Sequence, residues 1–156
     1  MNTIQAFETA VRNCLAVFGA EAVPVSWLHC SSIPADGDNT SGLQAYPQLL
    51  IAVAGKEFAA DGVTWSTAIT ITCETLSEDD RDASLLNSMY EAVENMFEHL
   101  VKGDATDEVV MHFNAQMRQA LPTFCLGRFV PTASDGIIEQ EQTRLVTFAG
   151  AFEYDY

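Results

Sequence analysis

The spacing of apolar residues predicts three helices in this chain. Residues 3 to 18 carry apolar side chains at every third or fourth position, which is the repeat of an amphipathic helix: Ile4, Phe7, Val11, Cys14, Leu15 and Phe18. The same repeat predicts a longer helix over roughly 81 to 101 and a third over roughly 105 to 120. Gly103 is expected to end the second helix in the left-handed conformation, and Thr106 is expected to cap the third.

Five segments have the residue types and spacing of strands. Residues 64 to 75 alternate cleanly between two faces, and so do residues 139 to 154. Residues 48 to 54 form a continuous apolar run, which predicts a central strand covered on both faces. Residues 22 to 30 and 124 to 130 are expected to form shorter strands.

The order of these elements predicts the fold class. A helix is followed by strands, then by two helices and then by strands, with no regular β-α-β-α alternation. We therefore expect an α+β fold in which an antiparallel or mixed β-sheet of about four to five strands has its helices packed on one face. The 156 residues fit a single domain, 1–156, and the polar segment 31–47 is expected to form an exposed loop.

The chain is strongly acidic. Seven Lys and Arg residues stand against 22 Asp and Glu residues, which gives a formal net charge of −15 and a pI near 4.2. Such a surface repels phosphate backbones, so specific binding of nucleic acid is disfavoured. A hydrophobic content of 48% indicates a globular rather than a disordered protein. The sequence shows neither an apolar run long enough for a membrane span nor a secretory signal, so we expect the protein to stay in the cytoplasm where it is made.

The sequence contains no recognisable catalytic or metal-binding motif. The three histidines do not pair at a ligand spacing, and we interpret them as structural. His29 and Cys30 are adjacent, but neighbours on a strand point to opposite faces, which leaves a Cys–His nucleophile as a minor alternative. The cysteines are expected to be reduced and buried: Cys14, Cys30, Cys73 and Cys125. We predict no catalytic residue, no metal and no cofactor.

The acidic residues are unevenly spread. Eleven of the 22 lie between residues 74 and 108. Among them Glu91, Glu94 and Glu98, called here the helical acids, follow helical spacing and are expected to share one face that carries no Lys. Two interpretations stay open for this face: it is a solvated surface, or it lines an anionic conduit or meets a basic partner.

The polar loop resembles the opening of an EF-hand calcium site. The resemblance fails because Ser41 and Pro47 occupy the positions that require Gly and Glu. Calcium binding is therefore not expected. The loop, with Asp36, Asp38 and Asn39, is instead a candidate interface arm that orders on contact with a neighbouring ring.

The layout of the chain resembles that of the tail terminator and tail-completion (head–tail joining) proteins of long-tailed phages. The resemblance covers an N-terminal helix over 3 to 18 and the Thr-rich strand from Val63 to Cys73. It continues through a helix of about five turns over 81 to 101 and ends with a strand from Thr143 to Phe152. The helix over 105 to 120 and the long loop depart from that layout.

This resemblance implies a structural virion protein rather than an enzyme. Such proteins form rings, usually hexamers, that cap the tail tube and join it to the head connector. The implied partners are further copies of the chain, the tail tube protein and the head connector proteins, while DNA passes through the ring without specific binding. The helical acids would then line the lumen, and ring contacts are expected at an exposed edge of the final strand.

Other functions stay open at this point. A different tail, connector or baseplate subunit of a phage or phage-like injection machine would share the composition and the layout. A small enzyme or ligand-binding domain would contain a concave apolar pocket. An acidic protein that mimics DNA would bind a basic partner in a salt-sensitive way.

Overall fold

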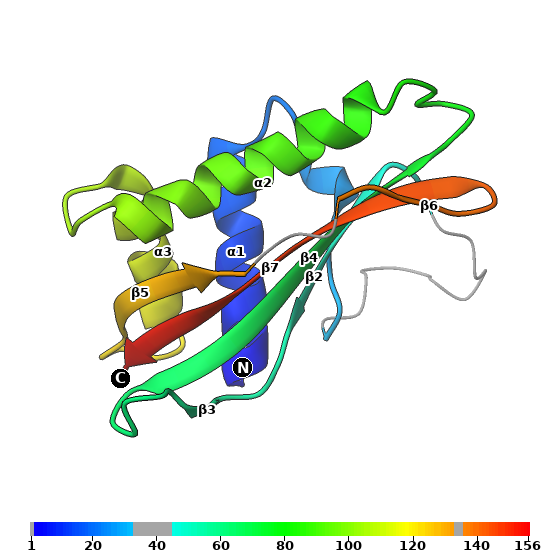
Figure 1. Cartoon of the computed structure of the whole chain (residues 1–156). Helices are drawn as coiled ribbons and strands as arrows, with labels where there is room; N and C mark the ends of the chain where they lie inside the picture. Colours follow the sequence, from blue (N-terminus) through cyan, green and yellow to red (C-terminus); the bar gives the residue numbers. More distant parts are fainter. Residues whose placement is uncertain (1, 33–44, 133–135) are drawn as a thin grey trace.

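The computed structural model describes residues 2–32, 45–132 and 136–156 (Figure 1). The three residues singled out in the predicted interface loop, Asp36, Asp38 and Asn39, lie outside these ranges. The described elements, in chain order, are α1 (Thr3–Phe18), a 3-10 helix (Val25–Trp27), β1 (Leu28–Cys30), β2 (Gln48–Val53), β3 (Glu57–Phe58), β4 (Trp65–Leu76), α2 (Ser84–Lys102), α3 (Glu108–Arg118), β5 (Cys125–Pro131), β6 (Ile138–Glu139) and β7 (Thr143–Asp155).

The strands form one mixed sheet. Its order is β1-β2-β4-β7-β5, with β3 paired to β4 and β6 paired to β7. β1 and β2 are parallel, and every other described pairing is antiparallel. The predicted α+β class is confirmed, but the described sheet has seven strands rather than four or five. The two additional strands, β3 and β6, are two residues long, which is too short to produce an alternating pattern.

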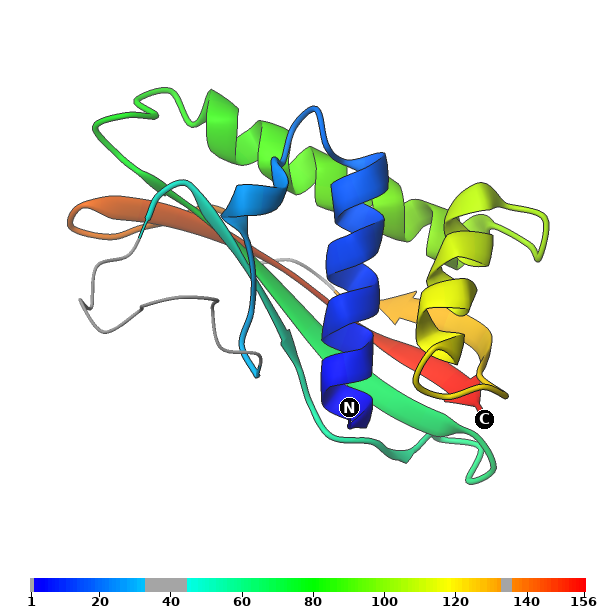
Figure 2. The ribbon, with the colours of Figure 1, turned by 180° about the vertical axis from the view of Figure 1, so that it is seen from behind.

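The α-helices of the described chain all lie on one face of the sheet, as predicted (Figures 1 and 2). Aromatic side chains join the two layers. The ring of Phe7 in α1 lies 4.9 Å from the rings of both Phe152 and Tyr154 in β7, measured between centroids. The ring of Phe97 in α2 lies 4.7 Å from that of Phe148, also in β7. Such pairs add about 0.5–1.5 kcal/mol each beyond the area they bury. The aromatic contacts with β7 therefore help to hold α1 and α2 against the sheet.

Strand β2 differs from its prediction. The apolar run predicted a strand covered on both faces, yet Leu49 and Ile51 are buried while Leu50 between them is 40% exposed. The helices cover only one face, so alternate residues of the run point away from them. The strand predicted over 22 to 30 is also shorter, because a 3-10 helix that follows Pro24 delays its start to Leu28.

The start of α2 depends on a buried carboxylate. The helix begins at Ser84 rather than at 81, and Ala83 before it has a left-handed backbone (φ 60°). Asp80 is only 4% exposed, and its oxygens accept hydrogen bonds from the backbone N–H groups of Leu85 (2.9 Å) and Leu86 (3.0 Å). The same carboxylate accepts a hydrogen bond from the Thr75 hydroxyl at 3.0 Å. Asp80 therefore caps α2 from the preceding loop and ties it to the end of β4.

The turn between α2 and α3 also corrects two predictions. Gly103 has an extended backbone (φ −73°, ψ 147°) rather than a left-handed one. It is required for another reason: a Cβ at this position would lie 2.5 Å from the carbonyl oxygen of His99 and 2.8 Å from Cβ of Asp107. The cap of α3 is Asp107, not Thr106, because the Asp107 side chain accepts from the N–H groups of the first turn at 2.9 and 3.2 Å.

The final strand is not an outer strand of the described sheet, contrary to the expectation. β7 pairs with β4 along nearly its whole length and, on its other side, with β5 over residues 150–155 and with β6 at residues 144 and 145. Within the described sheet the outer strands of the main path are β1 and β5. Contacts made through a sheet edge would therefore use β1 or β5.

Candidate functional site

The helical acids lie on α2, and all three are exposed. The expectation that their face carries no Lys is wrong at its C-terminal end. Lys102 Nζ lies 2.7 Å from a Glu98 carboxylate oxygen, one helical turn away. The hydrogen bond between them lowers the pKa of Glu98 and raises the pKa of Lys102. Glu91 and Glu94 have no such ion-pair partner among the described residues, so the uncompensated charge lies toward the middle of the helix.

A groove of about 750 Å³ runs between α1, α2 and the start of α3. Sequence analysis did not predict it, because its walls come from three separate segments. We call it the helical groove, and its lining residues fall at 17–22, at 88–99 on one side of α2, and at 107–109. A Cβ at Gly19 would lie 3.1 Å from the Leu15 carbonyl oxygen, so the glycine suits the end of α1, and Ala92 Cβ of α2 would lie at an ordinary contact distance of 3.8 Å.

The lining of the helical groove combines carboxylates with apolar side chains. Four carboxylates line it, from Glu21, Glu91, Asp107 and Glu108, beside apolar groups that include Val17, Phe18, Met96 and Val109.

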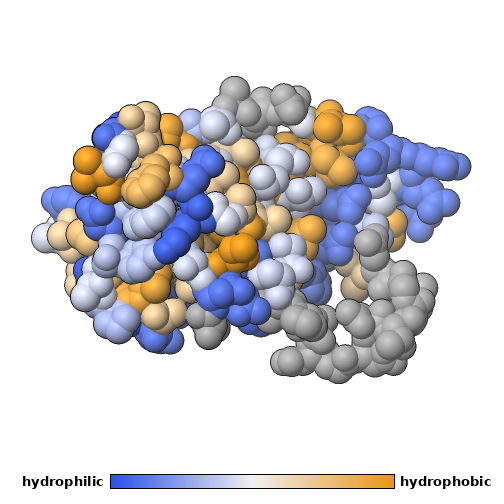
Figure 3. All heavy atoms as spheres, turned by 90° about the horizontal axis from the view of Figure 1, so that it is seen from below, coloured by the Kyte–Doolittle hydropathy of each residue, from blue (hydrophilic) through white to orange (hydrophobic). Residues whose placement is uncertain are grey.

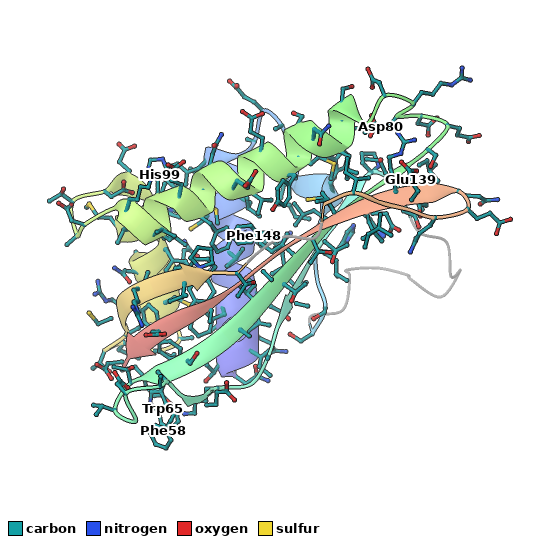
Figure 4. The ribbon with its side chains drawn as sticks, in the orientation of Figure 1. Phe58, Trp65, Asp80, His99, Glu139 and Phe148 are labelled. Atoms are coloured by element: carbon teal, nitrogen blue, oxygen red, sulfur yellow. The ribbon has the colours of Figure 1, made fainter. Side chains whose placement is uncertain are left out.

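One of these carboxylates already has partners within the chain. His99 Nδ1 lies 2.8 Å from Asp107 Oδ2, and this hydrogen bond is the largest cause of the lowered pKa of Asp107. Figure 4 shows His99 at the end of α2 that leads into α3. Because the other carboxyl oxygen of Asp107 accepts the N–H groups that start α3, this side chain is structural.

The face of the sheet opposite the helices carries little charge. We call it the open face, and its central residues are Leu50, Ala52, Ala68, Thr70, Thr72, Val130, Thr147, Ala149 and Ala151. Charged residues lie toward its ends, where Glu74 accepts a hydrogen bond from Gln48 (2.9 Å) and Glu153 pairs with Arg128 (2.8 Å). Figure 3, a view from below, shows hydrophilic residues gathered at the end of the molecule that carries the β6–β7 turn.

An aromatic patch lies at the opposite end of the sheet (Figure 4). Phe58 is 62% exposed and stacks on Trp65 with 4.5 Å between ring centroids. The Lys56 ammonium lies 4.5 Å above the Trp65 ring and 4.7 Å above the ring of Tyr156. The patch combines aromatic rings with one cation, so its chemistry suits packing rather than acid–base catalysis.

The cysteines are free thiols, but the prediction of burial holds for only two of them, since Cys30 is half-buried and Cys125 is exposed. Cys14 and Cys73 are buried, and burial raises the pKa of each to about 12, whereas Cys125 is exposed. Burial, with a smaller contribution from Glu8, raises the pKa of Cys30 to about 11. A nucleophilic cysteine needs a lowered pKa, so that the thiolate is present at neutral pH. The environment of Cys30 therefore does not favour a Cys–His nucleophile.

Glu8 was not predicted to have a role, yet it is completely buried. Its carboxylate accepts hydrogen bonds from the hydroxyls of Ser31 (2.9 Å) and Ser32 (2.6 Å) and from the Ser32 backbone N–H (3.1 Å). The available signal was its position in the apolar stripe of α1, one turn after Ile4. Glu8 anchors the segment that follows β1 to the first helix.

The described residues contain no group of three or more His, Cys, Asp or Glu side chains that could hold a metal ion. No described helix has the length and apolar character needed to cross a membrane. No family model and no curated protein matches the chain.

Proposed function

We propose that the chain is a structural virion protein, a tail terminator or tail-completion subunit that forms a ring at the end of a phage tail tube and joins the tube to the head connector. The observation that supports this most is the separation of charge on the molecule. The central part of the open face is uncharged, whereas the acids of α2 and of the α2–α3 turn lie in the helical layer. A ring subunit needs one area that contacts its neighbours and a second surface that takes no part in those contacts.

The open face and the outer strands supply the area for contact. Small and β-branched side chains make the open face suitable for close packing, and uncharged surfaces lose little solvation when they are buried. The outer strands β1 and β5 offer backbone groups for pairing with another chain. We propose that contacts between subunits, and with the tube and the connector, use these surfaces.

The helical acids supply the second surface. In a hexamer the formal charge would be six times the −15 of one chain. With Glu91, Glu94 and Glu98 turned toward the lumen, the ring would repel the phosphates of the passing DNA and would not hold it. This arrangement accounts for an acidic protein that works next to DNA without binding it.

Light scattering followed by negative-stain imaging tests this proposal. The purified chain is measured alone and then with tail tubes isolated from the strain that carries the gene. A discrete ring with a central hole, or a cap at one end of the tubes, is the expected result. A chain of 17.0 kDa that stays monomeric alone and leaves the tube ends bare would contradict it.

A further inference from the structure

We propose that the helical groove binds a basic amphipathic segment of a different protein. The groove combines exposed apolar side chains with carboxylates on all three of its walls. This inference goes beyond the proposed function, and Glu91 is the only helical acid that it shares with the proposed lumen.

The exposed apolar side chains of the groove come from the end of α1. Val17 is 58% exposed and Phe18 is 38% exposed, although both belong to a helix whose other side is buried in the core. The Phe18 ring is held in place by an edge-on contact with His112, with 5.6 Å between ring centroids. Exposed apolar side chains that adjoin one another in a concave surface are typical of a binding site. An apolar side chain of the partner would be seated here.

The charge of the groove selects the partner. Glu21, Glu91 and Glu108 come from three different segments, and none of them has a hydrogen-bonding or ion-pairing side chain among the described residues. A neutral or anionic occupant would leave these charges without a partner. Lys or Arg side chains beside an apolar one satisfy both features, and an amphipathic helix places them one turn apart.

The chain itself cannot supply such a segment. It has seven basic residues, and any two of them are ten or more positions apart: Arg12, Lys56, Arg81, Lys102, Arg118, Arg128 and Arg144. Consequently no stretch of two helical turns carries two positive charges. A folded second copy could bring cations only from separate segments of its surface, not from one amphipathic segment, and the occupant is therefore assigned to another protein.

The test uses the full chain and a synthetic helical peptide with Lys on one face and Leu on the other. Binding is measured by fluorescence anisotropy at low and at moderate salt. The E21Q/E91Q/E108Q variant removes the three unpaired charges of the groove and is expected to weaken binding by about tenfold at low salt. The variant E57Q/E78Q/E141Q makes the same change in net charge at exposed positions outside the groove, and it should bind as the wild type does.

A second variant separates the apolar contribution from the charge. Val17→Ser leaves every carboxylate in place and is expected to weaken binding by about fivefold with an unchanged salt dependence. Because Val17 is exposed, this substitution does not disturb the core.

Three results would overturn the proposal: equal affinities of the two triple variants, no binding of the peptide to the wild type, or self-association that E21Q/E91Q/E108Q abolishes. The last result would assign the groove to a second copy of the chain. Rings that form normally without peptide binding would refute this inference and leave the proposed function intact.

Discussion

Replacing Asp80 by Ala tests whether this buried carboxylate holds α2 to the sheet. The substitution removes an acceptor shared by two backbone N–H groups of the first turn of α2 and by the Thr75 hydroxyl. Loss of an N-cap costs about 0.5–2 kcal/mol, and each buried donor left without a partner costs about 1–3 kcal/mol. Since the Thr75 hydroxyl can rotate and water can enter from the loop side, we expect a loss of roughly 2–4 kcal/mol in the free energy of unfolding.

Urea unfolding followed by circular dichroism measures this loss. A domain of this size has a total stability of about 5–15 kcal/mol, so the variant is expected to stay folded in the absence of urea. The midpoint should fall with an unchanged slope, and the melting temperature should fall by roughly 5–15 °C. Asp80→Asn keeps one acceptor oxygen and should lose about half as much.

Asp79→Ala is the matched control for this experiment. Asp79 is the neighbouring residue, is exposed, and has no hydrogen-bonded side chain among the described contacts. Its replacement should change the unfolding free energy by less than about 0.5 kcal/mol. If Asp80→Ala and Asp79→Ala unfold within about 0.5 kcal/mol of each other, the carboxylate does not cap α2 in the way described.

Three further predictions concern the turn between α2 and α3 and the helical acids of α2. Gly103→Ala should destabilise the chain by about 1–3 kcal/mol, because the new Cβ would lie against a backbone carbonyl. Gly55→Ala is the control and should not destabilise the chain, since the space around Gly55 is open. Equal urea midpoints for the two variants would refute the prediction. Asp107→Ala should cost about 1 kcal/mol at neutral pH. The folded-state pKa of Asp107 is lowered, so its contribution is present above the unfolded-state pKa and is lost as the pH falls through the folded-state pKa. If Asp107→Ala lost as much unfolding free energy at pH 2 as at pH 7, the ionised carboxylate of Asp107 would not be the source of its contribution. Changing all three helical acids to Gln should leave ring formation intact but slow DNA ejection, measured by dye uptake of released DNA; ejection at the wild-type rate would refute the lumen assignment.

The periodic parts of the fold were predictable because they follow from one face of each element being buried. α1 occupies 3 to 18, as its apolar spacing predicts, and the alternation in β4 and β7 predicts which side chains face the helices. The same reasoning failed for β2, since a run of apolar residues does not reveal whether a second layer covers the sheet. Here Leu50 is exposed because the helices lie on one side only.

The features that depend on distant contacts were not predictable. Asp80 belongs to a run of acids that reads as a solvated helix start, and only its position against Thr75 and the first turn of α2 makes it a buried cap. Glu8 is a similar case, because its partners lie more than 20 positions away. The helical groove brings together the end of α1, one side of α2 and the start of α3, and no local pattern in the sequence relates these segments.

The number of copies of this chain in purified particles tests the central proposal most directly. Particles from the strain that carries the gene are counted, and labelled reference peptides of the chain are used to quantify it by mass spectrometry. A single ring predicts about six copies per particle for a hexamer. Absence of the chain from the particles would contradict a virion role, and a copy number close to that of the tube subunit would make it a tube component instead of the terminator.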